Sequence, residues 1–443
     1  ENHCSIIKGA FGYRAPPLEW FPDRSKWLVY GHAIVDREAG GPVWSAPVDT
    51  AGTATRRMID NERVLTISGA RGNRTVASLK LPKEEIDTAI TVVRSGGNAA
   101  DVGLPPLTLP DQKTVRTIDT AAEFGDWQVK SDPAPKLPAG LLSKPLTLTS
   151  PGQQVQQAVL SRSGTRLVSK VTPKPRAAST TTKPAKNKPA ENEPTEKPPK
   201  TLLSVSDVAS GDRLKEIPLT FDCILTAVNA DGTRCLVRTP GTDQGRIDVF
   251  STDDGSHIVG WRPYQKEEKR KRNVVFATFI DDTHVLTRGS GNQVVLWEIP
   301  SCKAIYSFET RQNPTLSSGG RYLVVPGKTN QDVRFYEPLT GQLRGGLKSL
   351  AIGAVCAFHP NGERLAIING GTIKLWNLKD GKMEKEFRVA LGGQTLKWCG
   401  DRYLLTGNRS LIDIEKELIV WTYAVAPGGL NLEGSPDGRH WFV

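Results

Sequence analysis

One stretch of this sequence constrains the fold more than any other. Residues Cys356 to Phe387 consist of four short apolar runs that are separated by three turn signals. The turns fall at Asn361-Gly362, at Asn369 to Gly371 and at Asp380-Gly381, and Asn and Gly are the residues that accept the positive φ of a tight hairpin. Apolar runs of strand length joined by such turns predict a four-stranded antiparallel meander.

The same unit recurs along the chain with a period of roughly 40 residues. Its signature is an apolar or aromatic residue, often followed by an acidic one, with Gly or a substitute five positions later. Four strands in each period of this length are typical of a β-propeller, so we predict an all-β fold of four-stranded antiparallel blades. In the C-terminal array the signature occurs at Ser206 with Gly211, Phe250 with Gly255, Trp297 with Cys302, Tyr336 with Gly341, Trp376 with Gly381 and Ile412 with Glu417.

The regularity of the pattern also divides the chain. Residues 1–17 carry no assignable pattern, and residues 18–90 indicate two looser blades of the propeller type. Residues 91–150 lose the periodicity and are rich in Pro, Gly, Ser and Thr, so we expect a linker or an irregular segment there. The remaining blades occupy residues 151–443. Within them, residues 173–200 form a Lys/Pro-rich insert without aromatic or large aliphatic side chains, which we expect to be disordered.

Composition narrows the classes of partner and site. The chain has 58 Lys and Arg against 47 Asp and Glu, a net charge of +11, which admits nucleic acid or an anionic surface as a partner. The excess comes partly from two local basic runs. Six cysteines are scattered without CxxC or CxxH spacing, so neither a zinc site nor a redox pair is indicated. No apolar run approaches the ~18 residues of a membrane span.

The cellular compartment stays unknown at this level. Unpaired cysteines favour the reducing cytoplasm. The sequence has no initiator Met, so we expect Glu1 to begin a fragment or a mature chain, and export of a longer precursor remains an alternative.

A family resemblance rests on residues 357–381. They contain Phe358, the Pro360-Asn361-Gly362 turn, a strand ending at Trp376, and Gly381. In this pattern they resemble a blade of the WD-repeat family, and the resemblance is most specific over residues 222–389. It implies a β-propeller that acts as a non-catalytic scaffold for protein–protein interactions. The structural residues of the repeat are then Trp297, Tyr336 and Trp376 with Gly255, Gly341 and Gly381.

The resemblance also implies something about stability. Blades of that family often add a Gly-His pair and an Asp, which form a buried polar network with the Trp and a strand Ser or Thr. The Gly-His pair is absent before these blades. We therefore expect apolar contacts to dominate between blades.

A second resemblance concerns the N-terminal part. Residues Asp36 to Trp44 resemble the tryptophan-docking repeat of quinoprotein propellers, and Asp413 to Trp421 has the same Asp-to-Trp spacing. Either seven or eight blades close one ring, or the N-terminal units end one propeller and a second begins after the linker. The alternative function is then a quinoprotein-like or hydrolase-associated propeller. Those dehydrogenases carry an adjacent cysteine pair that this chain lacks, so no cofactor is predicted.

No residue is assigned a catalytic, cofactor-binding or metal-binding role. The sequence lacks the GxSxG nucleophile elbow, and its six histidines are isolated. A basic run between two blades is either a solvated loop or a surface that contacts phosphates or an acidic partner, which gives weak nucleic-acid or anionic-surface binding as a third function. Its cations are Lys266, Lys269, Arg270, Lys271 and Arg272.

Overall fold

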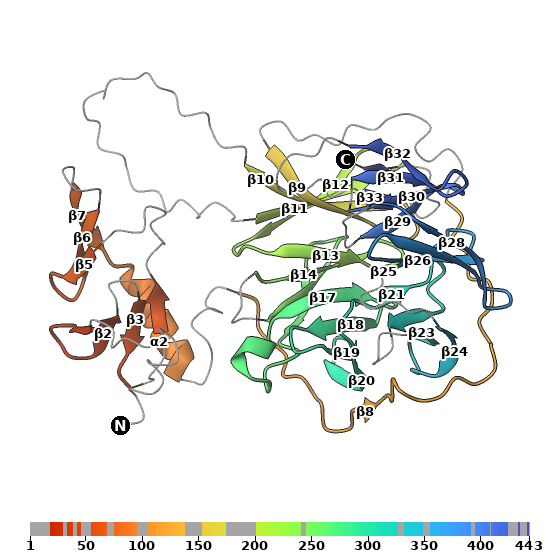
Figure 1. Cartoon of the computed structure of the whole chain (residues 1–443). Coiled ribbons are helices and arrows are strands. Elements are labelled where there is room, and N and C mark those ends of the chain that lie inside the picture. The colour runs from red at the N-terminus through yellow and green to blue at the C-terminus, as the bar shows by residue number, and fades with distance from the viewer. Residues whose placement is uncertain are drawn as a thin grey trace, which may run out of the picture. The chain divides into compact units, whose positions relative to one another are not determined.

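The chain divides into two compact units, Glu1–Pro105 and Pro106–Val443. Most of the described residues form strands in antiparallel sheets, so the all-β prediction is confirmed (Figure 1). Residues 1–17 and nearly all of the Lys/Pro-rich insert lie outside the described part. The computed structural model describes residues 18–29, 33–38, 42–45, 55–68, 75–94, 104–137, 153–173, 201–240, 245–326, 332–348, 355–390, 395–407, 409–423, 433–434 and 441–442.

The described residues of the first unit form two sheets and a helix. One sheet has four strands, and the other has three. The strands are β1 (Leu18–Trp20), β2 (Lys26–Val29), β3 (Ala33–Asp36) and β4 (Pro42–Ser45) in the first sheet, and β5 (Thr55–Met58), β6 (Arg63–Ser68) and β7 (Thr75–Lys80) in the second.

Helix α2 (Lys83–Arg94) differs from the expectation that residues 18–90 form two blades. The helix forms because Ile86, Ala89 and Ile90 have the spacing of one helical face, while acidic residues occupy the first turn, where the helix dipole favours them. Ile86 and Ala89 are buried in a core that also contains Leu28 and Val64. The second of the two predicted N-terminal blades is therefore a three-stranded sheet, β5–β7, followed by a helix.

The described residues of the second unit form six consecutive four-stranded antiparallel sheets, which we label S1 to S6. Sheet S3 gains a fifth strand, β8 (Arg116–Thr117), and a separate pair is formed by β33 (Glu433–Gly434) and β34 (Trp441–Phe442). The sheets are S1 (β9 Gln153–Leu160, β10 Arg166–Pro173, β11 Thr201–Asp207, β12 Arg213–Leu219), S2 (β13 Ile224–Val228, β14 Arg234–Arg238, β15 Ile247–Ser251, β16 His257–Trp261), S3 (β17 Val274–Phe279, β18 His284–Gly289, β19 Gln293–Glu298, β20 Lys303–Glu309), S4 (β21 Thr315–Leu316, β22 Leu323–Pro326, β23 Asp332–Tyr336, β24 Leu343–Lys348), S5 (β25 Val355–Phe358, β26 Arg364–Asn369, β27 Thr372–Asn377, β28 Lys382–Arg388) and S6 (β29 Leu396–Cys399, β30 Tyr403–Thr406, β31 Ser410–Asp413, β32 Leu418–Thr422).

Neighbouring sheets meet through their first strands. Strand β13 contacts both β9 and β17, β25 contacts both β21 and β29, and β33 contacts β9 (Figure 1). Buried apolar side chains fill the space between successive sheets: one core joins S2 to S3, a second S3 to S4, a third S4 to S5 and a fourth S5 to S6. Each sheet therefore buries its faces against the next one instead of against a separate layer.

The turn from the third to the fourth strand repeats from sheet to sheet. Its glycine has a positive φ at Gly211, Gly255, Gly341 and Gly381. In each of these turns the glycine N–H donates to the carbonyl four residues earlier, as Gly381 does to Asn377 at 3.0 Å. Cys302 and Glu417 occupy the same place in S3 and S6, with φ of 54° and 60°. This left-handed conformation is what the turn requires, and glycine adopts it at the lowest cost.

Buried polar networks accompany the apolar cores that lie between the sheets. In S3 the Trp297 indole N–H donates to the Thr287 hydroxyl at 3.0 Å, and that hydroxyl also bonds to the Tyr264 hydroxyl at 2.8 Å. In S2 the fully buried Arg246 and Asp248 form a bidentate ion pair, and His257 lies 2.9 Å from the same carboxylate. A tyrosine and an ion pair thus provide polar networks in sheets that lack the Gly-His pair.

Residues 106–137, which we call the strap, lie along the outer strands of S2, S3 and S4 (Figure 1). Thr108 N–H donates to Gly260, β8 pairs in parallel with β20, and Gln128 N–H donates to Arg344. Within the described residues 104–137, the two-residue strand β8 is the only helix or strand. The strap is nevertheless packed against the sheets, because its backbone completes hydrogen bonds that the outer strands would otherwise leave open.

Candidate functional site

The first hairpin of a sheet, between its first and second strands, has a repeated geometry. In four sheets the residue after the first strand donates its N–H to the carbonyl five residues later, and its own carbonyl accepts from a glycine three residues later. That glycine has a positive φ in each case. The pairs are Ser161 with Gly164 in S1, Asn229 with Gly232 in S2, Ser317 with Gly320 in S4 and His359 with Gly362 in S5.

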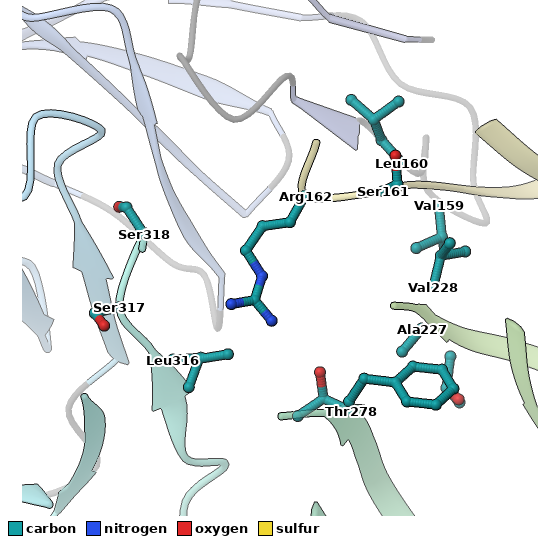
Figure 2. Close-up of a pocket in the computed structure, with 12 residues that line it drawn as sticks. Val159, Leu160, Ser161, Arg162, Ala227, Val228, Thr278, Leu316, Ser317 and Ser318 are labelled. Carbon is teal, nitrogen blue, oxygen red and sulfur yellow. The ribbon is translucent and has the colours of Figure 1, made fainter. Parts of the chain in front are cut away.

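A cavity of about 370 Å³ lies where the first strands of S1 to S4 end at these hairpins (Figure 2). Strand residues such as Val159, Ala227 and Leu316 form its apolar walls. Hydroxyl groups line it as well, but those of Ser317 and Ser318 already donate to Asp132 and to the His359 carbonyl. The chemistry of the cavity therefore depends mainly on its one cationic side chain.

Arg162 points into this cavity from the first hairpin of S1 (Figure 2). Its Nη2 donates to the carbonyl of Ile280, in the first hairpin of S3, over a long distance of 3.4 Å. A Cβ atom added to Gly320, in S4, would lie 2.1 Å from Arg162 Nη1, so the guanidinium rests against that backbone. One side chain thus reaches the hairpins of three sheets.

The electrostatics of Arg162 leave its donors available. Burial lowers the pKa of Arg162, and the carboxylates of Asp132, Asp281 and Asp282 oppose this effect. A guanidinium remains charged in proteins even after such a decrease. None of these carboxylates forms an ion pair with Arg162 among the described contacts. The site therefore offers a charged donor fork that suits a carbonyl or carboxylate oxygen.

The predicted basic loop lies between β16 and β17, and three of its cations contact other residues of the loop. Arg270 and Lys271 share the Glu268 carboxylate, at 3.0 Å and 3.6 Å, and Arg272 donates to the Glu267 carbonyl at 2.7 Å. Lys266 is exposed. Lys269 begins the short 3-10 helix η2 (Lys269–Lys271), and its side chain lies outside the described residues. The loop follows a fourth strand, whereas Arg162 follows a first strand, so the structure does not bring them together.

The predicted structural residues of the repeat lie in third strands and in the turns that follow them. Trp297, Tyr336 and Trp376 are buried near the ends of β19, β23 and β27. The turn glycines Gly255, Gly341 and Gly381 follow third strands of S2, S4 and S5. These positions belong to third strands and the turns that follow them, and not to the first hairpins that surround Arg162.

Sequence reasoning missed Arg162. An alignment of the first hairpins would have singled it out. The residue after Ser161 is Arg162. The equivalent residues after Asn229, Ser317 and His359 are Ala, Ser and Pro. A lone arginine among small or apolar residues at a repeated position indicates a local role. The hairpins could be aligned only after their hydrogen bonds were known.

The described cysteines and potential metal ligands do not indicate a second reactive site. Cys223, Cys235, Cys302 and Cys356 are unpaired and buried, and burial raises the pKa of each thiol to about 12. Within the ranges that the structure describes, no group of three or more His, Cys, Asp or Glu side chains could hold a metal ion. The helices of the same ranges are all too short or too polar to span a membrane.

The described part of the chain is thus an all-β structure of repeated sheets, four of which line the cavity that holds Arg162. No protein-family model matches the chain, and no curated protein is significantly similar to it.

Proposed function

We propose that the second unit is a β-propeller in which S1 to S6 are six blades and β33–β34 begins a seventh. Support comes from the contacts between first strands and from the cores shared by successive sheets. The pair β33–β34 follows S6 in the chain, and β33 contacts β9 of S1, which is the place where a closing blade is required. The four-stranded sheet β1–β4 belongs to the first unit and is not counted in this ring.

We infer that this propeller is a WD-repeat-like scaffold that binds other proteins and performs no catalysis. The observation that carries the proposal is Arg162, a charged donor held among hairpins of three sheets. Hairpins on a rigid set of sheets present a broad surface, and a central arginine is a frequent energetic anchor in protein interfaces. We expect the partner to accept hydrogen bonds from Arg162 through an acidic side chain or through an exposed carbonyl oxygen at a chain end.

The test is quantitative affinity capture with the purified chain. Wild-type protein, Arg162→Gln and Arg162→Lys are immobilised at equal density and exposed to extract of the source organism. We expect proteins that are retained by the wild type to be lost with Arg162→Gln and partly recovered with Arg162→Lys. Arg270→Gln, in the basic loop, is the matched control because it removes the same charge from another surface.

Two results would contradict the scaffold proposal. The first is a set of retained proteins that is unchanged by Arg162→Gln but lost in Arg270→Gln, which would contradict the role of Arg162 as the anchor of the interface. The second is the absence of any protein retained above a heat-denatured control. Thermal unfolding of each variant checks that lost capture does not reflect lost folding.

A further inference from the structure

A second pocket, which we call the strap pocket, lies between the strap and S4. Its volume is about 530 Å³, within the range of small-molecule sites. The strap contributes Trp127 and Lys130, and S4 contributes Arg321, Tyr322, Glu337 and Arg344. It shares no lining residue with the cavity around Arg162.

The strap pocket has an excess of positive charge. Its lining includes three cations and one carboxylate. The Arg344 guanidinium donates to the Glu337 carboxylate at 2.8 Å. It also donates to the Gln128 side-chain oxygen at 3.2 Å. Among the described residues, no carboxylate lies within ion-pair distance of the Lys130 or Arg321 side chain. Two cationic groups therefore remain without a counter-charge.

The backbone holds these two residues in place. The Lys130 N–H donates to the Tyr322 hydroxyl at 3.0 Å, and the Arg321 N–H donates to the Asp132 carboxylate at 2.8 Å. That carboxylate is buried and also accepts from Ser317, so it is committed to the backbone and hydroxyl donors. Lys130 and Arg321 are 191 positions apart in the chain, yet both line one pocket.

We propose that the strap pocket binds a phosphate monoester. Two uncompensated cations match its two negative charges, and the Arg321 guanidinium can bind phosphate oxygens through two parallel hydrogen bonds. The pocket is larger than a phosphate group alone, so the organic part of the ligand lies against Trp127 and Tyr322. The site is independent of the proposed scaffold role.

Calorimetric titration of the full chain tests this site with three probes: inorganic phosphate, adenosine monophosphate and O-phosphoserine, each at matched ionic strength. We expect binding that weakens at least tenfold in Arg321→Gln and in Lys130→Gln. Arg270→Gln combined with Lys271→Gln in the basic loop should leave the affinity unchanged. Tighter binding of adenosine monophosphate than of O-phosphoserine would indicate a nucleotide ligand, and the reverse order a phosphorylated protein.

The proposal is overturned if no probe binds, or if the basic-loop variant loses binding while Arg321→Gln keeps it. Thermal unfolding supplies a second readout that does not depend on calorimetric heat. Saturating adenosine monophosphate should raise the unfolding temperature of the wild type and of the basic-loop variant but not that of Arg321→Gln. Because the Arg321 side chain is exposed, this variant should fold as the wild type does.

Discussion

The Ser317 hydroxyl donates to the Asp132 carboxylate at 2.5 Å, although the two residues are 185 positions apart in the chain. The same carboxylate accepts from the Arg321 N–H at 2.8 Å. Asp132 thereby attaches the strap to the first hairpin of S4, next to the cavity that holds Arg162 and to the strap pocket.

Asp132→Ala should detach the end of the strap. The change leaves buried donors of Ser317 and Arg321 without their acceptor, which costs about 2–4 kcal/mol of unfolding free energy. Urea unfolding measures the loss, and hydrogen exchange of residues 124–137 should show faster exchange. Asp126→Ala is the control, because Asp126 is an exposed carboxylate on the same segment. Equal stability of both variants would show that the contact does not hold the strap.

Gly362→Ala should disturb the strap from the first hairpin of S5, which packs against Asp132. An added Cβ would lie 2.1 Å from the backbone carbon of Asp132, at a residue whose φ is +71°. We expect a loss of about 2–4 kcal/mol from backbone strain and overpacking together. Gly370→Ala has a similar φ of +51° but meets no atom within 4 Å, so it should lose only about 1 kcal/mol. Similar losses of unfolding free energy for Gly362→Ala and Gly370→Ala in urea would mean that the strap moves aside freely.

Trp297→Phe should cost more than Trp376→Phe, although both remove the same atoms from third strands. Trp297 donates to Thr287, whereas the Trp376 indole N–H has no acceptor among the described residues. The difference should be about 1–2 kcal/mol, because only the first change removes a buried hydrogen bond. In the Thr287→Val background the difference should shrink. Chemical unfolding of the wild type, Trp297→Phe, Thr287→Val and the double variant completes the double-mutant cycle for this bond.

His359 should make stability depend on pH. Burial lowers the pKa of His359 below 6.5, despite the Asp401 carboxylate 3.3 Å from Nε2. The unfolded chain then binds a proton at higher pH than the folded chain does. Stability should be complete above about pH 6.5 and should fall as the pH decreases toward the lower, folded pKa.

His359→Asn is the matched variant for this prediction, because Asn229 occupies the equivalent hairpin position in S2. Asparagine can accept the backbone hydrogen bond that His359 Nδ1 now accepts from Asn361. The variant should lose the decrease in unfolding free energy between pH 6.5 and 5. A slope that is unchanged from the wild type would assign the pH dependence to other groups.

The buried thiols should resist modification in the folded state. Because burial raises their pKa to about 12, Cys223, Cys235, Cys302 and Cys356 stay protonated at pH 8, and the thiolate is the reactive form. In a background that carries Cys4→Ser and Cys399→Ser, Ellman's reagent should label the four buried thiols only after urea is added. Rapid labelling without urea would show that these sheets open on the timescale of the assay.

Local chemistry was enough to predict the strands and turns of S2 to S6. A glycine such as Gly381 or Gly341 marks a turn because a left-handed backbone is costly for most residues, whatever surrounds it. The same reasoning did not find α2, although its apolar spacing was present in the sequence, because the blade pattern before it suggested more strands. Nor did it find Tyr264, which lies 23 positions from Thr287 without a motif to join them.

The sequence by itself determined the repeated hairpins, since turn preference and strand alternation are properties of a few adjacent residues. Only the tertiary structure decided which sheet edge the strap covers and which cavity receives Arg162. An extended segment has no internal hydrogen bonds, so its position depends on open backbone groups that exist only after the sheets have assembled. The surroundings of Arg162 also depend on the assembled sheets, because its guanidinium contacts hairpins that are more than a hundred residues away in the chain.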